Sequence, residues 1–113
     1  MTQQIPLQVT FRGMDRSEAV EERVSEKVAK LGRTGVKITD CKVVIEADPN
    51  PGKGFRFQVH AKAEVPGHGE LVASNDSDPE HQHDDVYVAI RDAMDALHRQ
   101  LEDLHDKRAS HRS

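Results

Sequence analysis

The stretch that decides the fold is Asp84–Arg108, which reads DDVYVAIRDAMDALHRQLEDLHDKR. Its apolar residues recur every three or four positions, which is the period of an α-helix with one buried stripe. The stripe consists of Tyr87, Ile90, Met94, Leu97, Leu101 and Leu104. Asp84 or Asp85 can cap the first turn, while Lys107 and Arg108 suit the negative end of the helix dipole. We therefore predict a long amphipathic helix that packs on a broad apolar surface.

Four other segments are predicted to be strands. In the first and third of them apolar and polar residues alternate, which is typical of a strand with one buried face. The expected strands cover 5–11, 38–47, 55–65 and 70–74. Turn-forming clusters at 48–52 and 66–69 separate the last three, so these three strands should form an antiparallel meander.

A second, shorter helix is predicted between the first two strands. Ser17 is the expected N-cap, and Gly32 and Gly35 flank the expected end. Its apolar line is Val20, Val24, Val28 and Leu31. A helix between two strands favours a right-handed crossover and parallel pairing. The sequence thus predicts an α+β fold of order β-α-β-β-β-α, with two helices packed on one face of a four-stranded mixed sheet. Arg56, His60 and Lys62 should remain on the opposite, solvated face.

Composition fits one compact domain over residues 5–108, followed by a short tail at 109–113. The formal net charge is −4, but residues 76–85 hold five acids and no Lys or Arg, so the rest of the chain carries +1. This acidic, aperiodic segment reads as a loop. Cys41 is the only cysteine, which excludes an internal disulfide, favours a reducing cytoplasm and suggests a buried packing residue. No apolar run is long enough to cross a membrane.

The chain carries no recognisable catalytic motif, such as GxSxG, a Walker loop, HExxH or CxxC. We therefore predict that it is not an enzyme and has no cofactor, metal or small-molecule substrate. One alternative stays open, because His81, His83, Asp84 and Asp85 combine donors that Zn²⁺ or Ni²⁺ accepts. On that hypothesis the loop would serve a metal-dependent hydrolase.

The shorter helix has an ordered charge pattern. Its basic residues are seven, four and three positions apart, which places them on one stripe beside the apolar line. They are Arg16, Arg23, Lys27 and Lys30, and the acids Glu18, Glu21, Glu22 and Glu26 lie round the other side. Arg91, His98 and His105 similarly follow one flank of the longer helix. Such stripes can be solvated surface or a binding face.

The segment 85–101, DVYVAIRDAMDALHRQL, closely resembles the helix signature D-x-Y-x-A-I-x-x-x-x-D-K-L-x-R-Q-L of a known family. This is the ribosome hibernation-promoting factor and ribosome-associated inhibitor A family, also known as the sigma-54 modulation family. Residues 17–20, SEAV, and 27–31, KVAKL, resemble its first helix. The order of elements also matches, and the similarity extends from about Ile5 to Lys107.

The resemblance implies a cytoplasmic protein of stress or stationary phase that inhibits translation without chemistry. It implies binding to 16S rRNA of the small ribosomal subunit, in the tRNA and mRNA channel, by a protein that is monomeric away from the ribosome. Lys27, Lys30, Arg99 and Lys107 match basic positions of the family. The complete predicted rRNA-binding set is Arg16, Arg23, Lys27, Lys30, Arg91, Arg99, Lys107 and Arg108.

The sequence also departs from the family pattern. Ala96, Asp103 and His105 stand at positions that are often basic, which weakens the expected rRNA contact of the second helix. The acidic His-rich segment 75–85 is longer than in the shortest members, and the second domain of long-form relatives is lacking. Whether the protein promotes or opposes ribosome dimerisation stays open. An alternative function is a regulatory adaptor that binds a protein through the solvated sheet face or the acidic loop.

Overall fold

The structure is a computed structural model that describes residues 4–49, 52, 54–75 and 85–110, with side chains described to residue 108. The elements are β1 (Leu7–Arg12), α1 (Glu18–Leu31), β2 (Asp40–Pro49), β3 (Phe55–Val65), β4 (Gly69–Ser74) and α2 (Val86–Ser110). The four strands form one sheet in the order β1-β2-β3-β4. β1 pairs parallel with β2, and the other neighbours pair antiparallel. The predicted topology is confirmed, with element ends displaced by a few residues.

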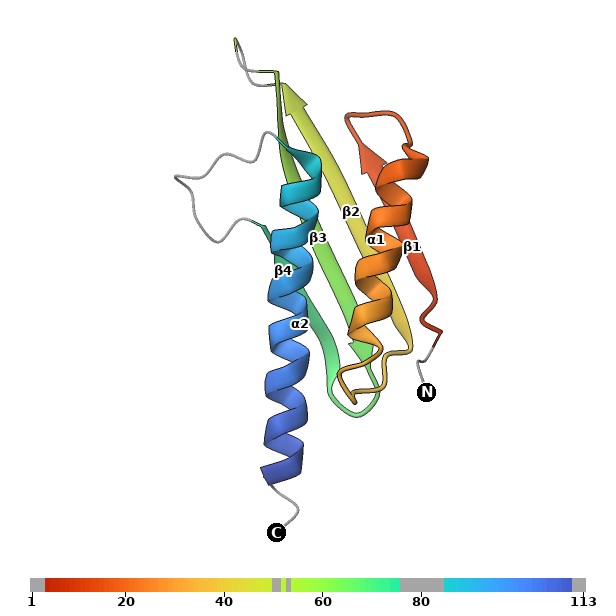
Figure 1. The fold of residues 1–113 in the computed structure, drawn as a ribbon, viewed down its shortest axis with the longest axis vertical. Helices are drawn as coiled ribbons and strands as arrows, with labels where there is room; N and C mark the ends of the chain where they lie inside the picture. Colours follow the sequence, from red (N-terminus) through yellow and green to blue (C-terminus); the bar gives the residue numbers. More distant parts are fainter. Residues whose placement is uncertain (1–3, 50–51, 53, 76–84, 111–113) are drawn as a thin grey trace.

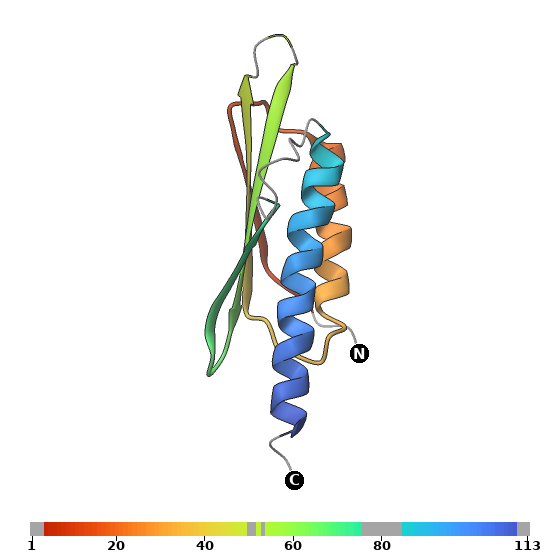
Figure 2. The same ribbon diagram turned by 90° about the vertical axis from the view of Figure 1, so that its left-hand side faces the viewer.

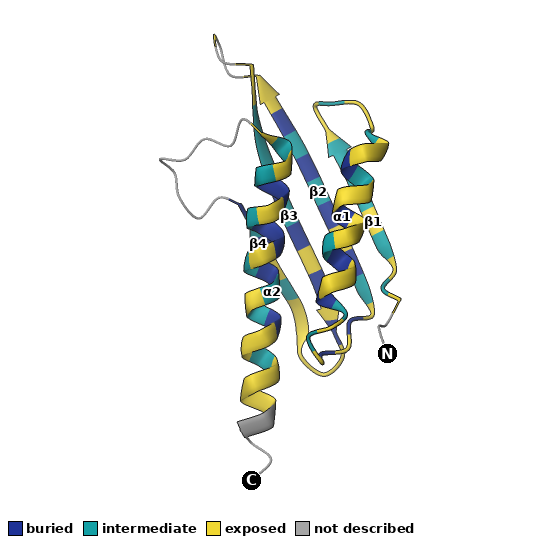
Figure 3. Ribbon diagram, viewed as in Figure 1, coloured by how far each residue is buried: buried dark blue, intermediate teal, exposed yellow. Residues whose placement is uncertain are grey.

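Both helices cover the same face of the sheet, and the opposite face carries no helix of the described chain (Figures 1 and 2). α1 lies over the β1 side and α2 over the β4 side. α2 extends past the end of the sheet, where its residues are exposed (Figure 3). Neither described helix combines the length and apolar character needed to cross a membrane.

The core is aliphatic and lies between the sheet and the two helices. Both sides combine alanines with larger aliphatic side chains, and the alanines let the helix backbones approach the sheet closely. Fully buried members include Ala61, Ala63, Val43, Val59, Val24, Ile90, Leu97 and Leu101. The alternation predicted for β3 is confirmed, because Val59, Ala61, Ala63 and Val65 are buried.

Local signals set the ends of α1. The Ser17 hydroxyl accepts a hydrogen bond from the Val20 N–H at 3.3 Å, which confirms the predicted N-cap. Gly32 ends the helix with ordinary right-handed backbone, φ −66°. The left-handed residue is Gly35, at φ +85°, where an added Cβ would lie 2.7 Å from Cδ2 of His105. Glycine is favoured there by the left-handed backbone, and its small size leaves room for the His105 ring of α2.

One member of the predicted α2 stripe is not in the core. Tyr87 is 37% exposed, so its placement among the buried residues is wrong. The helix instead buries Ala89 and Ala93 against the sheet. Tyr87 lies on the flank of α2 that faces α1, where its ring meets the side chain of Arg23.

Asn75 closes the sheet beyond β4. Its side chain is only 3% exposed, its Oδ1 accepts from the Val59 N–H at 2.9 Å, and its Nδ2 donates to the Phe57 carbonyl at 3.0 Å. The side chain thus pairs with β3 in the way a backbone would. The sequence predicts a polar loop at Asn75, because one Asn beside acidic residues gives no signal of burial.

We expect Leu97→Ala to lower the free energy of unfolding by about 2–5 kcal/mol through loss of apolar burial and a residual cavity. Leu104→Ala is the matched control, since Leu104 is only partly buried near the overhanging end of α2. Its loss should be clearly smaller. Urea unfolding followed by circular dichroism measures both. Equal losses would contradict the core assigned to α2.

Cys41 should make stability depend on pH. Burial, reinforced by the charge of Asp40, raises the pKa of its thiol from 9.0 to about 11. Because the folded pKa is raised, this contribution to stability is complete below the unfolded pKa and is lost as pH rises through the folded value. Between pH 7 and 10 the free energy of unfolding should fall by about 1 kcal/mol more in the wild type than in Cys41→Ala. Parallel pH profiles for the two proteins would refute this.

Candidate nucleic-acid interface

The basic flank of α1 faces α2. The guanidinium of Arg23 lies over the ring of Tyr87, 5.1 Å from its centroid, which fixes this side of α1 against the first turn of α2. Lys27 and Lys30 follow Arg23 by four and seven residues, so helical periodicity places them on the same flank. Lys27 is half-buried and Lys30 is exposed. Three cations therefore line α1 along its boundary with α2.

The facing flank of α2 is also basic. Arg91, His98 and His105 recur at intervals of seven residues and lie on one side of the helix. The ring of His105 lies beside Gly35, at the C-terminal end of α1, which shows that this side faces α1. We call the two flanks together, Arg23, Lys27 and Lys30 with Arg91, His98 and His105, the interhelical basic surface.

The cations of this surface differ in their local partners. Arg23 Nε is 3.7 Å from a Glu26 carboxylate oxygen, and Arg91 Nη2 is 3.2 Å from Asp92 Oδ1. His98 Nδ1 lies 3.0 Å from Glu102 Oε1. Lys27 and Lys30 form no ion pair within the part of the chain that the structure describes. These two lysines are therefore the ones most available to a negatively charged partner.

The other predicted site residues lie apart from this surface. Arg16 precedes α1, so the helical spacing that placed it on the stripe does not apply. Its guanidinium binds the Glu21 carboxylate, and that hydrogen bond raises the pKa of Arg16 further above its usual value. Arg16 thereby lines the opposite side of α1, next to β1. Arg99 is exposed on α2, while Lys107 and Arg108 are exposed on its overhanging end (Figures 1 and 3).

Asp95 and Arg99, like Asp103 and Lys107, have the (i, i+4) spacing of helical ion pairs, but neither pair occurs among the ion pairs of the described residues. Arg23, Lys27 and Lys30 thus lie on one flank of α1, and Arg91 lies on the facing flank of α2. The four other predicted residues lie apart from them.

Two of the three departures from the family pattern lie away from the interhelical basic surface. Ala96 packs against the core, and Asp103 follows it by seven residues on the same side of α2. This is the β4 side, because Gln100 between them donates a hydrogen bond to the Val72 carbonyl at 2.9 Å. Only His105 lies on the flank that faces α1. Two of the three non-basic residues at family positions that are often basic, Ala96 and Asp103, therefore lie on the flank of α2 that faces β4.

The structure adds Tyr87 to the site residues that sequence reasoning proposed. Its ring is exposed and its face is covered by the Arg23 guanidinium. The spacing in the sequence could have indicated this role. Tyr87 precedes Arg91 by four residues, which places it on the same flank of the helix as Arg91, His98 and His105. An aromatic residue beside cations also suits a surface that contacts bases or riboses.

No group of three or more His, Cys, Asp or Glu side chains able to hold a metal ion occurs among the described residues. Three of the four residues of the metal hypothesis, His81, His83 and Asp84, lie outside the described part of the chain. That hypothesis is therefore not tested by the structure.

Relatives of this chain have names that refer to the ribosome. It is 34% identical over 107 residues to Ribosome-associated factor Y of Haemophilus influenzae, covering 95% of this chain and 89% of the relative. It is 30% identical over 106 residues to the Ribosome hibernation promoting factor of Pseudomonas putida, covering 92% of each. The Ribosome hibernation promotion factor of Deinococcus radiodurans is 34% identical over 94 residues, and the match spans 46% of that longer protein.

Solved structures show the same fold. The N-terminal domain of Thermus thermophilus Protein Y matches with a TM-score of 0.66 at 22% identity, covering 90% of this chain and 99% of that one. A ribosomal subunit interface protein from Coxiella burnetii matches with a TM-score of 0.68 at 20% identity and the same coverage. The family model described as Sigma 54 modulation protein / S30EA ribosomal protein matches residues 7–109. The chain belongs to that family.

Proposed function

We propose that this protein associates with the ribosome and modulates translation, and that it contacts 16S rRNA of the small subunit through the interhelical basic surface. The relatives named for ribosome association and hibernation support the biological setting. The observation that carries the site is the pair Lys27 and Lys30, two cations without an ion-pair partner in the described chain, which follow Arg23 on the flank of α1 that faces α2.

The surface suits RNA for physical reasons. Packed helices lie about 8–10 Å apart, so the three cations of α1 face Arg91 and the imidazoles of His98 and His105 across a short gap. Structured RNA is bound largely by shape and by contact with its sugar–phosphate backbone, which needs positive charge on a rigid support and no catalytic group. Here the support is the helix layer, whose apolar stripes are buried on the sheet.

The finer proposal follows the family resemblance. The protein occupies the tRNA and mRNA channel of the small subunit in the cytoplasm under stress or in stationary phase, and inhibits translation by occupying that space. Residues 5–108 form the binding unit, 109–113 are a tail, and the protein is monomeric away from the ribosome. Arg16, Arg99, Lys107 and Arg108 would be peripheral contacts. The acidic segment 76–85 is expected to make no phosphate contact, because like charges repel.

We expect Lys27→Glu combined with Lys30→Glu to abolish binding to purified 30S subunits in a sedimentation assay. Each reversal removes one attraction to phosphate and adds one repulsion. Stability should change little, since both side chains lie beside the buried line of α1. The matched control is Lys42→Glu with Lys62→Glu, the same charge change at two exposed residues of the opposite sheet face. It should bind 30S subunits like the wild type.

Two outcomes would contradict this assignment. If the α1 variant remains folded by circular dichroism and sediments normally with 30S subunits, α1 is not the RNA-binding face. If the control variant loses binding while the α1 variant keeps it, the opposite face of the sheet contacts the subunit.

Binding should also weaken as salt rises, because each Lys–phosphate contact releases condensed counterions. In a plot of log affinity against log salt concentration, the neutral variant Lys27→Gln with Lys30→Gln should show a slope shallower by roughly one per lysine. Fluorescence anisotropy of labelled protein with 30S subunits, from low to moderate salt, measures both slopes. A wild-type affinity that stays flat would exclude phosphate contact as the basis of binding.

A further inference from the structure

The two edges of the sheet differ in how they are protected. At the β4 edge, the side chain of Gln100 on α2 donates to the Val72 carbonyl at 2.9 Å. β1 is the other terminal strand, and no strand of the described residues pairs with its outer side. Its sequence, LQVTFR, has high β-propensity and lacks charge, proline and a bulge before Arg12. Edges of this kind are open to pairing with another chain.

The backbone groups available at this edge can be assigned. The Cys41 N–H donates to the Pro6 carbonyl at 2.9 Å, so Pro6 points its carbonyl toward β2. Successive residues of a strand direct their backbone groups to opposite sides. Leu7, Val9 and Phe11 therefore present their N–H and C=O groups away from β2, along the open edge.

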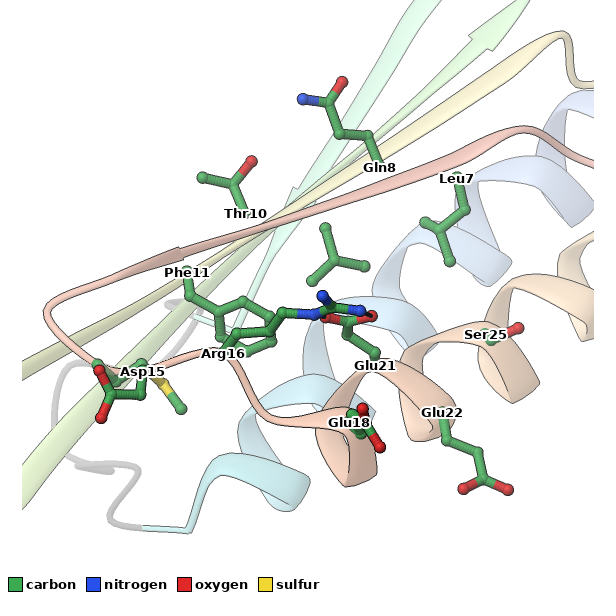
Figure 4. Close-up of a pocket in the computed structure, with 12 residues that line it drawn as sticks. Leu7, Gln8, Thr10, Phe11, Asp15, Arg16, Glu18, Glu21, Glu22 and Ser25 are labelled. Carbon is green, nitrogen blue, oxygen red and sulfur yellow. Dashed lines mark hydrogen bonds and ion pairs between the residues drawn. The ribbon is translucent and has the colours of Figure 1, made fainter.

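A groove runs along this edge between β1 and α1. Two adjoining hollows that share Leu7 and Ser25 form it, and together they extend from Gln4 to Arg16. Leu7 and Phe11 point to the α1 side of the strand, whereas Gln8 and Thr10 point to the other side (Figure 4). The partly buried Leu7, Val9, Phe11 and Met14 give the groove an apolar floor.

The wall of the groove is acidic. Asp15, Glu18, Glu21 and Glu22 line it, against the single cation Arg16 (Figure 4). Arg16 is already bound to Glu21, whereas Glu18 and Glu22 form no salt bridge with any described residue. This flank of α1 is the opposite of the one that carries Arg23, Lys27 and Lys30, so the helix separates its charges by side.

We propose that the β1 edge is a docking site for an extended, basic segment of a partner protein, which adds as a fifth strand and places Lys or Arg in the groove. An added strand would lie about 4.8 Å from β1 and direct every second side chain toward α1. Lys and Arg fit there because their aliphatic stems can cover Val9 and Phe11 while their charged ends reach Glu18 and Glu22. Six residues of β1 offer room for about three such positions.

A second copy of this chain is a poorer occupant of the edge. Pairing of two β1 strands would continue the sheet and bring the acidic flanks of two α1 helices toward one another. Like charges in that arrangement repel, and neither copy offers a cation other than the occupied Arg16 in its groove. Nucleic acid is excluded from this flank by the same carboxylates. The charge of the groove thus selects a basic peptide.

The probe is a fluorescein-labelled peptide of sequence Thr-Lys-Thr-Lys-Thr-Lys-Thr with blocked ends, titrated with the full chain and followed by fluorescence anisotropy. Amide NMR shifts should concentrate on residues 7–12 and the N-terminal half of α1. The peptide with Glu in place of Lys should not bind. The Lys peptide N-methylated at alternate residues should bind at least tenfold more weakly, because it cannot complete the ladder of hydrogen bonds.

Two matched variants separate the site from general attraction to an acidic protein. Glu18→Gln with Glu22→Gln should weaken peptide binding at least tenfold. Glu64→Gln with Glu70→Gln, the same charge change at two exposed residues of β3 and β4, should leave it within twofold. Lys27→Glu with Lys30→Glu should retain peptide binding, so this result is independent of the proposed ribosome contact.

The proposal is overturned if the Lys peptide fails to bind, if the N-methylated peptide binds equally well, or if the two Glu→Gln pairs weaken binding to the same extent. It is also overturned if residues 7–12 shift with protein concentration in the absence of peptide and sedimentation detects a dimer. The edge would then pair with a second copy.

Discussion

The whole molecule depends on one packing constraint, the burial of two helix stripes on the same face of a four-stranded sheet. The sheet contributes Ala61 and Ala63 together with larger residues such as Ile45, and the helices contribute Val24, Leu97 and Leu101. Close packing of this kind fixes the rotation of each helix about its axis. Once the apolar stripes face the sheet, the charged flanks of α1 and α2 have no freedom to turn elsewhere.

Because the rotation of α1 is fixed, its basic residues lie on the side that faces α2 and most of its acidic residues lie on the side that faces β1. The basic flank of α1 meets the basic flank of α2 and is held there by Arg23 on Tyr87 and by the approach of His105 to Gly35. The acidic flank of α1 faces the free edge of β1. A chain with a net charge of −4 can in this way present concentrated positive charge on one surface.

The polar side chains at the ends of the sheet show why the two edges differ. Near β4, two side chains form hydrogen bonds with strand backbone. Gln100 donates to the outward-facing Val72 carbonyl of β4, and Asn75 accepts from the Val59 N–H of β3. β1 has only Arg12 paired with Glu46 across the outer face, at 3.4 Å. The backbone groups at the outer edge of β1 therefore remain open to hydrogen bonding. The acidic side chains of α1 beside this edge disfavour pairing with a second copy of the chain.

Periodicity in the sequence by itself determined the element order and the side of each helix that is buried. The residue type of Ser17 predicted the N-cap, and the helix between the first two strands predicted their parallel pairing. These features follow from local chemistry, because a residue's distance along the chain fixes its direction on a helix or strand. The sequence also identified Arg23, Lys27, Lys30 and Arg91 as candidate contacts, partly through family resemblance. It could not show that the flanks carrying these four residues face each other, since that depends on how two elements distant in the chain pack.

Only the tertiary structure decided the remaining assignments. Arg16 has the spacing of the basic stripe, but it precedes the helix and its guanidinium turns to Glu21. Tyr87 has the spacing of the apolar stripe, but small alanines fill the space against the sheet and the ring packs against α1 instead. Asn75 looks like any loop residue until the neighbouring strand offers it a donor and an acceptor. In each case the deciding interaction is with a residue that sequence spacing alone does not bring into contact.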